Sequence, residues 1–78
     1  MLKLIKKHEE NNIVNFAVEF DEEFGKMFEI SFDVSTKYDE PVSTTIPDCY
    51  SLKIAQARSA VDRYFGQNIP NVIYSQTH

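Results

Sequence analysis

The chain has 78 residues and a formal net charge of −4. This length suits one domain, and a composition of 42% hydrophobic and 13% aromatic residues excludes a disordered chain. The acidic balance disfavours sequence-independent binding to nucleic acid, which requires Lys and Arg to replace phosphate counterions. We therefore expect one compact domain over residues 1–78, with a protein rather than a nucleic acid as its partner.

The cellular compartment is predicted from features that the sequence lacks. Cys49 is the single cysteine, so an internal disulfide is excluded, and no apolar run approaches the roughly 18 residues that span a bilayer. The stretch from Met1 to Lys7 has neither the apolar segment nor the small-residue cleavage site of a signal peptide. These features predict a cytoplasmic protein that makes no use of a membrane.

The first part of the chain predicts three strands. Leu2–Lys6 alternates weakly and is predicted to be a short strand, followed by a polar loop over residues 7–12. The stretch Ile13–Val34 alternates clearly and predicts an amphipathic β-hairpin. Its apolar side carries Val14, Phe16, Val18, Phe20, Phe28, Ile30, Phe32 and Val34. A register shift of one residue would expose this whole set to water, so the pattern predicts which side faces the core.

The loop of this hairpin follows from the requirement that the two apolar sides coincide. A three-residue loop at 23–25 places Phe20 opposite Phe28 and Glu19 opposite Glu29, with a glycine at the left-handed position that such loops commonly require. A loop of two residues pairs apolar residues with acids instead. The three-residue loop is therefore the prediction.

The connection from residue 35 to residue 41 is rich in turn-formers and leads to a predicted strand at Val42–Ile46. A helix is then predicted from about Tyr50 to Phe65, with Asp48 or Ser51 as its N-cap and Gly66 as its C-terminal cap. A last short strand is predicted over residues 71–75.

The helix is expected to cover the apolar side of the sheet, because an isolated hairpin is only marginally stable. Its core-facing stripe is predicted to consist of Tyr50, Ile54, Ala57, Val61, Tyr64 and Phe65, with Lys53, Gln56, Arg63 and Gln67 pointing away. The complete prediction is an α+β fold of two layers: an antiparallel meander sheet of about four to five strands with one C-terminal helix on one face.

Acidic residues gather on the predicted outer side of the sheet. Glu19 lies across from Glu29 in the predicted register, with Asp33 further along. Like charges directly opposite each other destabilise a sheet mildly. Either solvent and the nearby Lys3 and Lys7 neutralise these carboxylates, or a basic protein surface binds them.

The tip of the hairpin is the second candidate, because Phe24 is a large apolar residue at a turn surrounded by acids. It either anchors an interface, as aromatic side chains commonly do, or folds back onto the edge of the core. The candidate partner-binding residues are Glu19, Asp21, Glu22, Glu23, Phe24, Glu29 and Asp33.

No set of residues has the spacing of a catalytic, cofactor or metal site. His8, Glu9 and Glu10 match no zinc motif, Cys49 has no second cysteine at the spacing of a metal or redox motif, and neither glycine belongs to a phosphate-binding loop. We therefore expect a protein without enzymatic activity, cofactor or metal.

In size, charge and hairpin-plus-helix layout, the chain resembles small phage-encoded inhibitors of host proteins, including anti-CRISPR proteins. The passage from Pro47 to Phe65 also resembles the strand-to-helix passage of small antitoxins with a partial ribonuclease-H-like fold, although this chain lacks their glycine-rich stretch. The first resemblance implies a protein that blocks its partner through the acidic sheet face and the hairpin loop. The alternative is a dimeric antitoxin or regulatory subunit that pairs through sheet edges.

Overall fold

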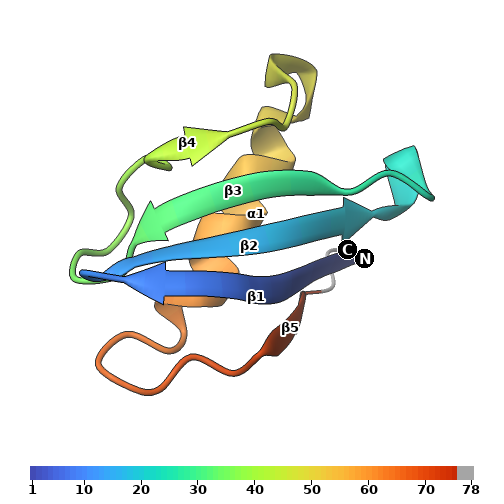
Figure 1. Ribbon diagram of the computed structural model, residues 1–78. Helices are drawn as coiled ribbons and strands as arrows, with labels where there is room; N and C mark the ends of the chain where they lie inside the picture. The colour runs from blue at the N-terminus through green and yellow to red at the C-terminus, as the bar shows by residue number, and fades with distance from the viewer. Residues whose placement is uncertain (76–78) are drawn as a thin grey trace.

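The computed structural model describes residues 1–75 and contains a five-stranded antiparallel sheet with one α-helix across one face (Figure 1). The strands are β1 (Leu2–Glu10), β2 (Ile13–Phe20), β3 (Phe28–Asp33), β4 (Ser43–Thr44) and β5 (Val72–Ser75), and the helix is α1 (Ser51–Asp62). Their order across the sheet is β4-β3-β2-β1-β5. The predicted α+β fold, with two layers, a meander sheet and one helix, is confirmed.

The first strand is longer than predicted, because β1 continues past Lys6 to Glu10. A two-residue turn at Asn11 and Asn12 then reverses the chain, with φ angles of 52° and 68°. Such a turn needs two positive φ angles, which asparagine tolerates better than most residues. The predicted loop over residues 7–12 is wrong. The polar residues there belong to a strand end that projects beyond the core and is exposed on both sides.

The register of the second hairpin differs from the prediction by two residues. Val18 lies opposite Phe28, and Ala17, not Glu19, lies opposite Glu29. The connection is longer than three residues because Asp21–Glu23 forms a 3₁₀ turn directly after β2. Since side chains alternate with a period of two, a shift by two leaves the same apolar residues facing the helix. The predicted faces are therefore correct, and the predicted cross-strand pairs are wrong.

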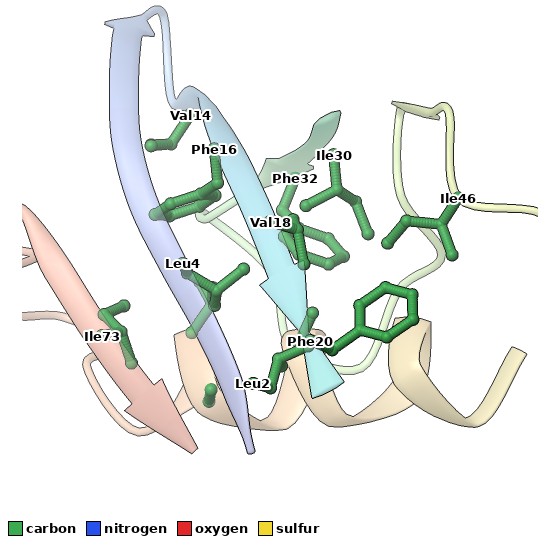
Figure 2. Close-up of a cluster of buried hydrophobic side chains, with 13 residues drawn as sticks. Leu2, Leu4, Val14, Phe16, Val18, Phe20, Ile30, Phe32, Ile46 and Ile73 are labelled. Carbon is green, nitrogen blue, oxygen red and sulfur yellow. The ribbon is translucent and has the colours of Figure 1, made fainter. Parts of the chain in front are cut away.

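The core lies between the sheet and α1, where the strand side chains converge on the helix (Figure 2). Large residues come from the strands, and the helix contributes small ones. Phe16 and Phe32 are fully buried against a helical face that carries Ala57 and Ala60. Small side chains let the helix approach the bulky aromatic layer closely, as dense packing requires. The buried apolar residues of this core are Leu2, Leu4, Val14, Phe16, Val18, Phe20, Ile30, Phe32, Ile46, Ala57, Ala60, Val61 and Ile73. Ala17 is also buried, but on the opposite face of the sheet.

The helix is shorter than predicted, and its buried face is wider. Lys53 and Arg58, at 8% and 5% exposure, lie against the sheet, whereas Phe65 is 45% exposed. The prediction that Lys53 points away from the core is wrong. Both long side chains bury their apolar stems and direct their charged ends to partners at the edge of the core.

The ends of the helix also differ from the prediction. The residue preceding its first turn is Tyr50, and no side chain caps the free N–H groups there, so neither Asp48 nor Ser51 acts as the N-cap. A second 3₁₀ turn (Asp48–Tyr50) leads into the helix instead. Gly66, with φ of +77°, lies beyond the end of the helix and closes the turn that follows.

The predicted strand Val42–Ile46 is shorter in the structure, where β4 covers only Ser43–Thr44. The Thr44 hydroxyl donates to the Glu29 carbonyl at 2.8 Å and accepts from the Ile46 N–H at 3.1 Å, so a side chain replaces ladder hydrogen bonds. β5 pairs with β1 and confirms the predicted last strand. Within residues 1–75, no helix combines the length and apolarity needed to cross a membrane.

Candidate functional site

The loop between β2 and β3 presents Phe24 to solvent, with 85% of the residue exposed. The 3₁₀ turn ends at Phe24, whose extended backbone is followed by Gly25 at φ of +87°. The N–H of Lys26 donates to the Glu23 carbonyl at 3.0 Å and closes the turn. The prediction that Phe24 folds back onto the edge of the core is wrong, and its role as an interface anchor stays a prediction.

The three acids that precede this tip in the chain are paired with other groups of the protein. Asp21 accepts a hydrogen bond from the N-terminal ammonium at 3.0 Å. The Glu22 carboxylate lies 3.1 Å from Lys53 Nζ, and that ammonium in turn lies 5.8 Å from the centre of the Phe20 ring. The hydrogen bond from Lys53 lowers the pKa of Glu22 below its ordinary value. Glu22 therefore joins the loop to α1.

Glu23 makes a third attachment. Its carboxylate accepts a hydrogen bond from the Tyr50 hydroxyl at 3.0 Å and lies 3.4 Å from Lys26 Nζ. The bond to Glu23 raises the pKa of Tyr50, because the neighbouring carboxylate disfavours the phenolate. The Tyr50 ring also packs edge-on against Phe20, with 5.0 Å between ring centres. The three consecutive acids thus hold the loop in place rather than forming a free negative patch.

The predicted pair of opposed glutamates on the outer sheet face does not exist. Glu19 lies opposite Lys3 of β1, so the predicted neighbouring lysine is present, although no ion pair joins the two side chains in the described part of the chain. Lys3 also lies 5.7 Å from the centre of the Tyr74 ring. Lys7 falls in the bulge of β1 and is not opposite either acid. Glu29 is exposed on this face and is opposite a small neutral residue.

Asp33 lies at the far end of the hairpin from the loop. It is opposite Ile13, the first residue of β2, whereas the loop follows Phe20, the last. Seven residue steps along a strand correspond to roughly 23 Å. Its carboxylate accepts from the N–H and the hydroxyl of Ser35, at 2.9 and 2.5 Å, which lowers the pKa of Asp33. Asp33 therefore stabilises a turn and is not brought to the Phe24 loop.

The structure also shows residues that sequence reasoning missed. Lys53 anchors the loop, and Arg58 anchors the connection after β3 by donating to the carbonyls of Asp33, at 3.0 Å, and Thr36. Helical spacing does place Lys53, Ala57 and Ala60 on one face, and the two small residues there are a signal of close approach. Arg58 has one near partner, Asp62, at the i,i+4 spacing of a helix. The groups by which Lys53 and Arg58 hold the two loops lie more than 20 residues away in the chain, and no local pattern identifies them.

Residues 1–75 contain no group of three or more His, Cys, Asp or Glu side chains placed to hold a metal ion. Cys49 is exposed. No family model, curated protein or solved structure matches the chain. The geometry of the described residues is therefore the ground for a functional proposal.

Proposed function

We propose that this chain is a non-enzymatic module that binds another protein through the β2–β3 loop, with Phe24 as the anchor. The observation that carries the proposal is the 85% exposure of a phenylalanine on a loop held by three separate side-chain contacts. Aromatic residues dominate binding hot spots. A loop already held in place loses less conformational entropy on binding, which leaves more of the contact energy as affinity.

Glu29, an exposed carboxylate that takes part in no ion pair among residues 1–75, favours a partner with a basic surface beside the loop. Asp21 and Glu22 side chains are 67% and 50% exposed despite their ion pairs, and Glu29 is exposed on the adjoining sheet face. Charges of this kind increase association rate and selectivity more than affinity. The proposed surface thus comprises Asp21, Glu22, Glu23, Phe24 and Glu29, with Glu19 at its margin, and it omits the distant Asp33.

The consequence of binding is proposed from the resemblance to small phage-encoded inhibitors, anti-CRISPR proteins among them. Such a protein acts by covering a working surface of its partner, which requires contact area and no chemistry. We propose the same for this chain, acting in the cytoplasm.

The test is site-specific crosslinking in the native host. Benzoyl-phenylalanine placed at position 24 should crosslink one partner, whereas the same group at position 52 should not. Leu52 is a matched control because it is also apolar and 76% exposed. With the partner purified, Phe24→Ala should weaken binding by roughly thirtyfold, as expected for a hot-spot aromatic residue. Leu52→Ala should leave affinity unchanged.

The proposal fails if Phe24→Ala binds the partner as tightly as the native chain. Charge reversal at Glu29 should slow association without removing binding, and the two effects together distinguish an aromatic anchor from purely electrostatic recognition.

Pairing of two copies through sheet edges stays a prediction, and the described edges do not favour it. β4 has two residues and is flanked by Pro41 and Pro47, a common way of limiting edge pairing. On β5, Arg63 donates to the Tyr74 carbonyl at 3.1 Å and occupies that acceptor.

A further inference from the structure

A groove of about 530 Å³ lies between α1 and the connection that leads from β3 to β4, away from the Phe24 loop. Pro41 forms one wall, and Ile54 and Ala55 of the helix form the other. This volume falls in the range of ligand-binding clefts. Neither Phe24 nor any other residue of the β2–β3 loop contributes to it, so the groove is a separate surface.

Both walls of the groove are held in place. Arg58, 5% exposed, donates to the Asp33 and Thr36 carbonyls and lies 3.1 Å from the Asp62 carboxylate. Asp62 in turn accepts from the Tyr38 N–H at 3.1 Å, which fixes the near end of the connection on the helix. At the far end, the N–H of Val42 donates to the Ser31 carbonyl at 2.8 Å. The groove exists before any ligand binds.

The rim of the groove is acidic. Asp39, Glu40 and Asp48 line it and are exposed. None of the three takes part in an ion pair among residues 1–75. The cation in the lining, Arg58, is already neutralised by Asp62. In this respect the groove differs from the Phe24 loop, in which Asp21, Glu22 and Glu23 each pair with another group of the same chain.

We infer that this groove binds a peptide segment in which arginine or lysine side chains are flanked by apolar residues. The apolar walls accept the flanking side chains, and the three free carboxylates complement the cationic groups. The occupant is a protein segment, not a free small cation, because the walls offer apolar contact that a bare cation does not use.

The probe is a fluorescein-labelled peptide with a central leucine–arginine–arginine–leucine sequence between serines and glycines, followed by fluorescence anisotropy. Saturable binding is expected, and it should weaken with added salt. Replacing both arginines with citrulline, a neutral isostere, should weaken binding about tenfold. Arginine amide alone should compete only weakly, and equal competition would overturn the assignment of a peptide.

Two matched double variants test the position. Asp39→Asn with Glu40→Gln should weaken binding about tenfold, whereas Glu9→Gln with Glu10→Gln, the same change of charge on β1, should leave it within about twofold. Equal weakening by both pairs would show non-specific attraction and overturn the inference.

A steric variant tests the groove without changing charge. Ala55 is exposed on the helix, so Ala55→Tyr should fill the groove and remove binding while the far-UV circular dichroism stays native. Unchanged affinity in Ala55→Tyr, or no saturable binding of the native chain up to about 1 mM peptide, would refute the inference. Phe24→Ala should bind the peptide normally, so the outcome is independent of the function proposed for the loop.

Discussion

Replacing Arg58 with methionine is expected to be among the most destabilising single changes in this chain. The guanidinium lies over the Phe32 ring at 5.2 Å and links α1 to two carbonyls of the connection after β3. Its Nε lies 3.1 Å from the Asp62 carboxylate, but this N–H is poorly directed and makes no hydrogen bond. The interaction with Asp62 is therefore mainly one of charge.

The expected magnitude follows from burial. The side chains of Arg58 and Asp62 are 6% and 8% exposed, so methionine at position 58 leaves a carboxylate buried without its countercharge. Removing one partner of a buried pair costs about 3–5 kcal/mol. A domain of this kind has a total free energy of unfolding of about 5–15 kcal/mol, so much of it would be lost.

The assay is urea denaturation followed by far-UV circular dichroism. The midpoints of the variants are compared on condition that the dependence of the unfolding free energy on urea concentration is unchanged. Arg63→Met is the matched control, because Arg63 is exposed and makes one hydrogen bond, and it should cost less than about 1 kcal/mol. Combining Arg58→Met with Asp62→Asn should recover about 0.5–3 kcal/mol relative to the sum of the single changes. Strict additivity, or a loss at Arg58 no larger than that at Arg63, would refute the reasoning.

Three further changes test the loop and the core. Lys53 lowers the pKa of Glu22 from 4.5, so the folded state holds fewer protons than the unfolded state near that pH. Stability should fall as the pH drops through this window, and Glu22→Gln should reduce that slope in urea midpoints taken between about pH 3 and pH 6; an unchanged slope would contradict the contact. An alanine Cβ at position 25 would meet no atom within 4 Å, but the backbone there has a φ of +87°. Gly25→Ala should therefore lower the free energy of unfolding by about 1–2 kcal/mol, from backbone strain alone, and an unchanged free energy of unfolding would argue against a left-handed residue at this position. Phe32→Ala should cost about 3–5 kcal/mol, whereas Phe24→Ala should stay within about 0.5 kcal/mol, and equal losses would place both rings in the core.

The alternation of residues 13–34 was sufficient to predict the two layers, because burial of one face of a pleated sheet imposes a period of two on the sequence. The same period also limits what alternation can predict. Registers that differ by two residues bury identical side chains, so the pattern could not distinguish Glu19 from Ala17 as the partner of Glu29. The loop decided between them, because the 3₁₀ turn lengthens the connection.

The sequence predicts which residues belong to the candidate site, but not which of them contact one another. Phe24 was identified at the tip, and the structure shows it exposed. The sequence predicts the acids beside it as partner-binding residues, and the structure shows that Lys53 and Tyr50 hold two of them. Lys53 lies in α1 and Tyr50 in the 3₁₀ turn that precedes it, more than 20 residues later in the chain, and their approach depends on how this segment lies on the sheet.

The sequence by itself determined the fold class, the buried side of each strand and the position of Phe24, because these follow from local period and turn chemistry. Only the tertiary structure decided the strand register, the burial of Lys53 and Arg58, and which carboxylates remain unpaired. Each of these depends on contacts between distant segments, whose geometry is set when the helix packs against the sheet. The tertiary structure thus distinguishes the acids that hold the Phe24 loop from the unpaired acids that line the groove beside α1.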